Sequence, residues 1–149
     1  MTEVLFYHLQ SMTVENVLPP LLEKSLERGW RVVVQSTSPE RADALDAHLW
    51  TYRDDSFLPH GADHEPHAAE QPVILTAGPA NPNCAQIRFL VDGASPPPLD
   101  GYERAVFLFD GNDEGQIEAA RGHWKALKGD GHGVTYWQQT PEGRWEQKA

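Results

Sequence analysis

The amino-terminal third of the chain alternates between two residue patterns, one typical of strands and the other of helices. Residues 3–9 and 30–35 are short apolar runs rich in aromatic or β-branched side chains, and a helical pattern follows each of them. Because strands that alternate with helices pair in parallel through right-handed crossovers, this order predicts a parallel sheet with helices packed on it. We therefore expect an α/β fold with three layers around a mostly parallel central sheet.

Two helices are expected to connect the first strands. The first covers residues 13–29, is capped by a threonine, and has leucines along its inward face. Pro19 and Pro20 either kink this helix or mark its true first turn. The second helix begins with Ser38 as N-cap and Pro39 as its first residue. Its inward face consists of apolar side chains: Ala42, Leu45, Leu49 and Trp50.

The alternation stops at residues 51–71, which we expect to form a long loop held to the core by Phe57 and the leucine after it. Further apolar runs predict four strands: 72–76, 86–91, 104–109 and 133–139. The proline-rich stretch 93–102 connects strands rather than domains, because too few residues follow it to build a second core. We expect a single domain over residues 1–149, ending in a tail that contains Trp145.

Residues 112–128 form a predicted helix with marked ends and two distinct faces. Asn112 is a suitable N-cap, and Gly129 is placed to end the helix. At about 100° per residue, an apolar stripe lies roughly a quarter turn from a cationic stripe. The apolar stripe contains Ile117, Ala120, Trp124 and Leu127, and the cationic stripe contains Arg121, Lys125 and Lys128.

A tryptophan at the border of these stripes makes the helix a candidate binding surface. Trp124 is a large amphipathic ring beside three cations, which suits an acidic ligand that also carries a hydrophobic group. The alternative is that the cations complement the helix dipole and keep the surface soluble, while Trp124 belongs to the core. Phe57 has a similar alternative as a core residue beneath the long loop. Trp30, Trp50 and Trp137 are expected to be packing residues.

Overall charge argues against one large class of partner. The chain has a formal net charge of -10 and only 12 Lys and Arg in 149 residues, so extensive direct contact with DNA or RNA is not expected.

No apolar run approaches the roughly 20 residues that span a bilayer, and the start lacks a secretory signal pattern. We expect a cytoplasmic protein without membrane contact. The single cysteine, Cys84, excludes an internal disulfide and is expected to be a small core residue.

Common catalytic and cofactor motifs are absent. Residues 8–13, after the first strand, contain no glycine, so we predict a Rossmann-like fold without a phosphate-binding loop and without a cofactor. No G-x-S-x-G elbow surrounds a serine, and no catalytic residue is assigned. His60, His64 and His67 occupy a run with Pro and Gly that is not a preformed site, so no metal is expected. The rival hypothesis is a nucleotide- or metal-binding enzyme that uses the sheet edge near Asp110 and the His60 loop.

Five sequence blocks follow one another along nearly the whole chain. They are FYHL in the first strand, RADALDAHLWTYRDDSFLPHG at 41–61, QPVIL at 71–75, FLFD at 107–110 and AARGHWKALK at 119–128. In this order the blocks resemble the chi subunit family of bacterial DNA polymerase III holoenzyme, and LW followed by SFLPH is the most specific element.

The resemblance implies an accessory protein rather than an enzyme. Proteins of this family belong to the clamp-loader assembly, pair with a psi subunit or another clamp-loader subunit, and hold the acidic C-terminal tail of single-stranded DNA-binding protein. The tail-binding residues of the family correspond here to Phe57, Arg121, Trp124 and Lys125, and Lys128 replaces another basic residue. The family usually has tyrosine at position 124. A further alternative is an interaction module that serves a helicase in DNA repair.

Overall fold

The computed structural model describes residues 2–10, 12–51, 61–62, 70–79, 81–99, 101–140, 142 and 144–148, with only the backbone described at 50–51 and 61–62. The helices are α1 (Val14–Glu27), α2 (Pro39–Thr51) and α3 (Glu114–Gly129). The strands are β1 (Glu3–Leu9), β2 (Val32–Gln35), β3 (Gly61–Ala62), β4 (Val73–Thr76), β5 (Ile87–Val91), β6 (Arg104–Asp110), β7 (Gly133–Gln139) and β8 (Trp145–Gln147).

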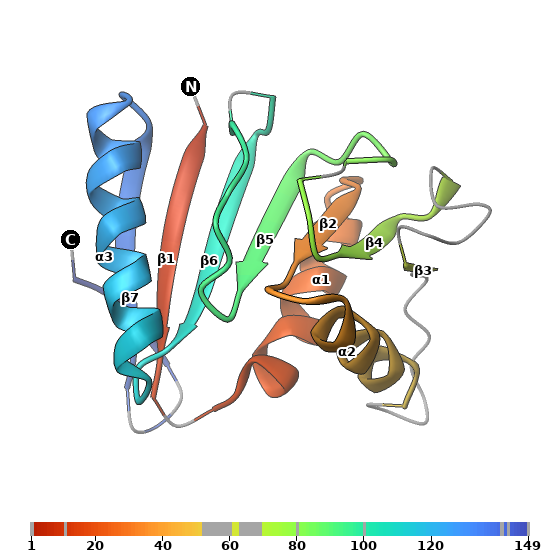
Figure 1. Ribbon diagram of the computed structural model, residues 1–149, viewed down its shortest axis with the longest axis horizontal. Helices are drawn as coiled ribbons and strands as arrows, with labels where there is room; N and C mark the ends of the chain where they lie inside the picture. Colours follow the sequence, from red (N-terminus) through yellow and green to blue (C-terminus); the bar gives the residue numbers. More distant parts are fainter. Residues whose placement is uncertain are drawn as a thin grey trace.

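The strands form one sheet in the order β3-β4-β2-β5-β6-β1-β7-β8 (Figure 1). Every pair in it is parallel except β7 with β8, so the predicted mostly parallel sheet is confirmed. The predicted tail instead contains the edge strand β8. It is antiparallel because the short connection from β7 allows a hairpin but not a crossover. The predicted long loop likewise contains the short strand β3.

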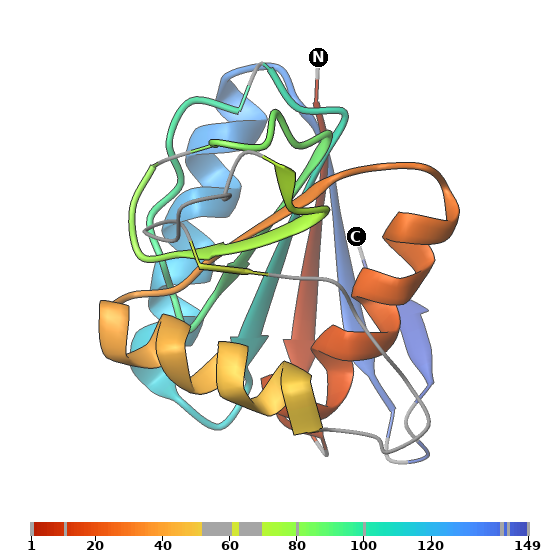
Figure 2. The same cartoon turned by 90° about the vertical axis from the view of Figure 1, so that its right-hand side faces the viewer.

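The helices lie on both faces of the sheet, which confirms the three predicted layers (Figure 2). Side chains of α1 and α2 share one core cluster with Leu5 and Leu9 of β1, whereas Ala120 and Leu127 of α3 share a second cluster with Phe6. The chain leaves β1 and β6 in opposite directions along the sheet, and crossovers of one hand then place α1 and α3 on opposite faces. None of the described helices combines the length and apolar character that crossing a bilayer requires.

β1 is the strand that aligns the residues facing α3. It pairs in parallel with β6 and β7, so Phe6 lies opposite Phe107 on one side and Tyr136 on the other. Phe6 is fully buried and stacks on Phe107 with ring centroids 4.5 Å apart and planes 2° from parallel. Since alternate side chains of a strand share a face, His8 points to the same side as Phe6.

The ends of α3 differ from the predicted ends. Asp113, not Asn112, is the N-cap, because its carboxylate accepts a hydrogen bond from the Gln116 amide at 3.1 Å. The Asn112 side chain instead donates to the Gln10 carbonyl at 3.3 Å and links the helix start to the end of β1. Gly129 is the last residue of the helix rather than the residue that follows it, Asp130 is the C-cap, and Gly131 comes next with a φ of 89°.

α1 begins at Val14, so its prolines do not mark the first turn. Pro19 has no N–H and cannot bond the Glu15 carbonyl one turn earlier. The His48 ring of α2 fills this role, with Nε2 2.8 Å from that carbonyl oxygen. α2 begins as predicted, because the Ser38 hydroxyl accepts a hydrogen bond from the Arg41 amide at 3.2 Å.

Two predictions outside the helices are wrong. Cys84 is exposed rather than part of the core, because it lies in a turn at a φ of 52° and its amide donates to the Asn81 carbonyl. β2 begins at Val32 rather than Trp30. The partly buried Trp30 ring lies under the Arg28 guanidinium, 4.9 Å from the ring centroid, and still packs against the core as predicted.

The stacked pair predicts a measurable coupling between two strands. We expect Phe6→Leu and Phe107→Leu each to lower the free energy of unfolding by about 1–3 kcal/mol. In the double variant the losses should depart from additivity by about 0.5–1.5 kcal/mol, because the ring contact can be lost only once. Urea unfolding followed by circular dichroism measures all the values. Phe6→Leu combined with Leu22→Ala, in the other core cluster, is the additive control. Equal additivity in both pairs would contradict the stacking argument.

Candidate binding site

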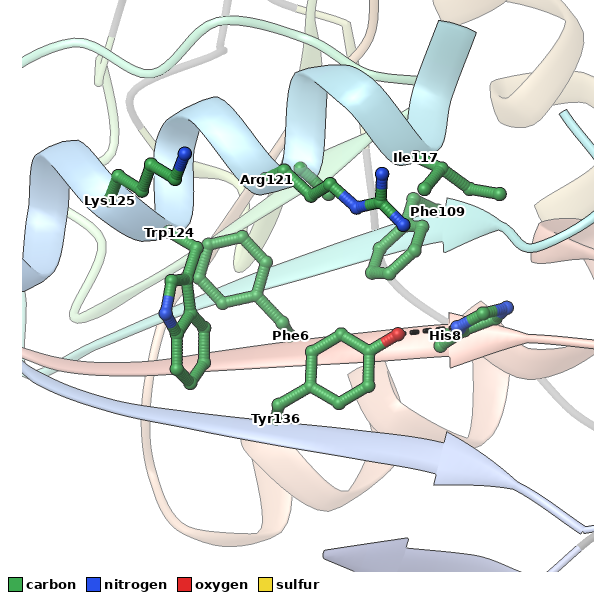
Figure 3. Close-up of a pocket in the computed structure, with 9 residues that line it drawn as sticks. Phe6, His8, Phe109, Ile117, Arg121, Trp124, Lys125 and Tyr136 are labelled. Atoms are coloured by element: carbon green, nitrogen blue, oxygen red, sulfur yellow. Dashed lines mark hydrogen bonds between the residues drawn. The ribbon is translucent and has the colours of Figure 1, made fainter. Parts of the chain in front are cut away.

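A recess of about 440 Å³ opens between α3 and the neighbouring strands (Figure 3). β1 contributes Phe6 and His8 to its lining, β6 contributes Phe109, and β7 contributes Tyr136. The lining residues from α3 are Ile117, Ala120, Arg121, Trp124 and Lys125. The walls are therefore mostly aromatic or aliphatic, and one helix adds two positive charges.

The period of the helix explains how α3 presents both kinds of side chain. Ala120 and Leu127 are buried against the sheet, Trp124 is half-buried, and Arg121 and Lys125 are exposed. Arg121 and Lys125 are one turn apart, so they border the same opening, with Trp124 beside them. The predicted apolar and cationic stripes are thus present, and three predicted site residues lie around one recess.

The other two predicted site residues are placed differently. Lys128 does not line the recess, although its ammonium lies 5.7 Å from the Trp124 ring centroid. That distance allows a cation–π interaction with the same ring. Phe57 lies outside the described residues.

Trp124 joins the helix to the aromatic floor. Its ring meets Phe6 at a centroid distance of 5.6 Å and an angle of 67°, and Tyr136 at 6.1 Å and 81°. Edge-to-face contacts of this kind favour one ring orientation, so the indole forms a defined wall. Trp124 is therefore both a packing residue and part of the recess surface.

A polar pair lies in this otherwise apolar floor. His8 Nδ1 and the Tyr136 hydroxyl are hydrogen-bonded. Burial lowers the pKa of the His8 imidazole below its usual value, and Asp110 acts in the opposite direction. Burial raises the pKa of the Tyr136 phenol, while Arg121 opposes that change. Tyr136 is therefore neutral near pH 7, and deprotonated His8 is favoured there.

Gly111 provides the space that the His8 ring occupies. A Cβ atom at position 111 would lie 1.9 Å from His8 Nε2 and 2.7 Å from the Leu9 carbonyl oxygen. Only glycine permits this approach without displacement of the ring or the backbone. The residue after β6 thus contributes to the site by lacking a side chain.

The strand residues of the recess were missed by the sequence reasoning. Phe6, His8, Phe109 and Tyr136 come from three strands that are far apart along the chain. Strand alternation does predict that Phe6 and His8 share a face. It does not give the order of strands in the sheet, which determines that β6 and β7 flank β1.

A second hollow, of about 220 Å³, lies where β1 and β6 end, near the sheet edge named in the rival hypothesis. Its charged residues are Glu15, Asp92 and Asp110 together with Arg41. Arg41 is already engaged, because it forms ion pairs with Glu15 and with Asp92. Carboxylates outnumber the cation, so this edge disfavours phosphate groups.

The described side chains include no group of three His, Cys, Asp or Glu residues that could hold a metal ion. His60, His64 and His67, the metal candidates from the sequence, lie outside the described residues.

Together these features define a Rossmann-like α/β domain that lacks a phosphate loop and presents a basic and aromatic recess beside its last helix. The family model described as "DNA polymerase III chi subunit, HolC" matches residues 1–135. The chain therefore belongs to the DNA polymerase III chi subunit family, as the sequence blocks predicted.

Two curated relatives carry the name of this family. "Probable DNA polymerase III subunit chi" of Rickettsia prowazekii is 29% identical over 91 residues, covering 61% of this chain and 55% of the relative. "DNA polymerase III subunit chi" of Pseudomonas aeruginosa is 33% identical over 81 residues, covering 52% of this chain and 56% of the relative. The matched region thus spans about half the length of each relative.

Two glycine substitutions test the structure around the recess. We expect Gly111→Ala to lower the free energy of unfolding by about 1–3 kcal/mol, because the new methyl group overlaps His8 and the Leu9 carbonyl. Gly122→Ala is the matched control on the exposed side of α3, where a Cβ meets nothing within 4 Å. It should raise stability by about 0.5–1 kcal/mol. Urea unfolding measures both changes, and effects of the same sign would contradict the described geometry.

Proposed function

We propose that this chain is a non-catalytic accessory subunit of the DNA polymerase III clamp-loader assembly. In this role it binds the acidic C-terminal tail of single-stranded DNA-binding protein and links that protein to the replisome during DNA replication. The observation that carries the proposal is a recess in which Arg121 and Lys125 border an aromatic wall, on a chain of net charge -10. Family membership supports it, because both relatives are named as subunits of DNA polymerase III.

Charge pairing supports an acidic ligand at this recess. Within the described part of the chain, no ion pair joins Arg121 or Lys125 to a carboxylate, whereas Arg41 and Arg104 each have a carboxylate partner. Unpaired cations that border an apolar wall attract carboxylates and lose little by exchanging water for them. A tail with several aspartates and a terminal apolar side chain matches both parts of the recess.

The size of the recess favours a short segment. About 440 Å³ is within the range of about 300–1,000 Å³ typical of small-ligand sites, which suits a chain end rather than a folded partner. Burial of one apolar side chain contributes about 1.5–3 kcal/mol, and each exposed ion pair about 0.2–1 kcal/mol. The sum places the affinity at micromolar or weaker, which corresponds to about 8 kcal/mol or less. Because the cations are exposed, binding weakens as salt concentration rises.

The remaining members of the proposed site and assembly rest on the family resemblance. Phe57, from the SFLPH block, is included among the proposed tail-binding residues. Lys128 supports Trp124 and attracts the tail from the edge of the site. A psi subunit or another clamp-loader subunit tethers the protein to the loader in the cytoplasm, and a helicase is an alternative partner.

Charge reversal at the centre of the site tests the proposal. We expect Arg121→Glu to abolish binding of a tail peptide, because it replaces the central cation by a carboxylate that repels the ligand. Isothermal titration calorimetry measures the affinity, and circular dichroism checks that the fold is intact. Lys24→Glu, at an exposed position of α1 on the opposite face of the sheet, is the control with the same change in net charge. Equal binding by Arg121→Glu and the control would exclude this recess as the tail site.

A pair of lysine variants tests which cations contact the ligand. Lys125 lines the recess and Lys128 does not, although both are exposed on α3. We expect Lys125→Met to weaken tail binding more than Lys128→Met, by about threefold, which is the effect of one exposed ion pair. Titrations at low and high salt should show that the difference between the two variants shrinks as screening increases. A larger loss in Lys128→Met would place the ligand further along the helix.

A further inference from the structure

The hydrogen-bonded His8–Tyr136 pair closes the end of the recess near the carboxyl ends of β1 and β6, where a dashed line marks the bond in Figure 3. Apart from the two α3 cations and the indole N–H of Trp124, these are the only recess-lining side chains in the described part of the chain that have polar atoms. The proposed function accounts for the cations and the rings but not for this pair.

Neighbouring groups hold the His8 ring in place. Its centroid is 5.1 Å from that of Phe109, and it meets the Tyr136 ring at 87°. On its other side the ring occupies space that a Cβ at position 111 would fill, with a Cβ-to-Nε2 distance of 1.9 Å. The pair is therefore positioned by packing as well as by its hydrogen bond.

Either arrangement of protons leaves the pair able to donate a hydrogen bond. If the Tyr136 hydroxyl donates to Nδ1, the neutral imidazole carries its proton on Nε2. If Nδ1 carries the proton and donates to the phenol oxygen, the Tyr136 hydroxyl is free to donate into the recess. An acceptor beside Tyr136 favours the second arrangement, in which His8 supports the phenol as a donor.

A cation lies near this donor. Arg121 acts electrostatically on Tyr136, and Figure 3 shows its guanidinium extending toward the end of the recess that holds Tyr136 and His8. Lys125 lies toward the opposite end (Figure 3). A guanidinium and a hydroxyl donor at one end form a combination that binds the two oxygens of one carboxylate.

We propose that Tyr136, supported by His8, acts with Arg121 to bind the chain-terminal carboxylate of the ligand, and so sets the direction in which the tail lies. This inference rests on the proposed function and adds specificity-determining residues to it. The terminal side chain packs on the rings of Trp124 and Tyr136, and the aspartates before it extend past Lys125 along α3. A peptide with an amidated end lacks the charge that this corner recognises.

The same contact links binding to a proton. Among the described residues, the titratable or charged groups around His8 are Tyr136 of β7, Asp110 at the end of β6 and Arg121 of α3. Burial lowers the pKa of His8 in the free protein. A bound carboxylate favours the imidazolium and raises that pKa, so the complex takes up a proton. The extra affinity is fully present below the pKa that His8 has in the free protein. It is lost as pH rises through the pKa that His8 has in the complex.

The experiment uses a synthetic peptide of consecutive aspartates ending in phenylalanine, made with a free carboxylate or an amide at its C-terminus. Calorimetry compares both forms on the wild-type protein, Tyr136→Phe and Arg121→Glu. We expect the wild type to prefer the free acid by about tenfold, since a hydrogen bond to a charged group is involved. In Tyr136→Phe the preference should fall to about threefold or less, while affinity for the amide stays within about twofold.

A pH series tests the role of His8 separately. Between about pH 8 and 6 the peptide carboxylates stay ionised. The wild type should bind the free acid about three- to tenfold more tightly at the lower pH. His8→Asn keeps a hydrogen-bonding group without titrating in this range, so it should lose the dependence. His123→Asn is the matched control, because His123 lies on α3 beside Phe107 and outside the recess lining. It should keep the dependence.

The outcomes separate the two proposals. Equal wild-type affinity for both peptides, or an equal loss for both in Tyr136→Phe, overturns the carboxylate contact and leaves the recess as the tail site. A pH dependence that survives in His8→Asn overturns the role of His8. Failure of the wild type to bind either peptide overturns both this inference and the proposed function.

Discussion

The packing of Trp124 onto Phe6 is the interaction on which the recess depends. Phe6 of β1 is fully buried and stacks on Phe107, so it offers α3 a rigid aromatic floor. Trp124 meets that floor edge to face, and this contact sets how α3 is turned about its axis. Once the rotation of α3 about its axis is fixed, helical geometry places Arg121 and Lys125 at the rim of the recess.

Local charge distinguishes this aromatic recess from the rest of the described surface. The chain is strongly acidic, yet its last helix presents a row of cations, and in the described residues those at the recess are without carboxylate partners. The hollow at the ends of β1 and β6 differs in this respect, because its arginine, Arg41, already forms ion pairs with carboxylates. In the proposed function, ligand recognition thus lies beside a helix and not at the edge of the sheet where β1 and β6 end. The acidic surroundings also repel other polyanions, which favours short acidic segments.

Local sequence signals predicted the helices and strands well, but they predicted the helix caps and the placement of single residues less well. The capping serine of α2, the stripes of α3 and the parallel sheet follow from periodicity and propensity, which act over a few residues. Asn112 was mistaken for the cap because its amide is as good a capping group as the Asp113 carboxylate, and only the contact with Gln10 favours one over the other. Cys84 was assigned to the core because a free cysteine is usually buried, but a tight turn directs it outward.

The amino-acid sequence alone indicates the α/β class, the family and the helix that carries Arg121, Trp124 and Lys125, because these follow from local residue patterns and from the order of the sequence blocks along one chain. That Phe6, His8 and Tyr136 complete the recess becomes visible only in the folded structure. Their meeting depends on strand order, and strand order is set by the packing of the whole sheet rather than by any short stretch of residues. The same holds for Gly111, whose missing side chain matters only because His8 lies against it.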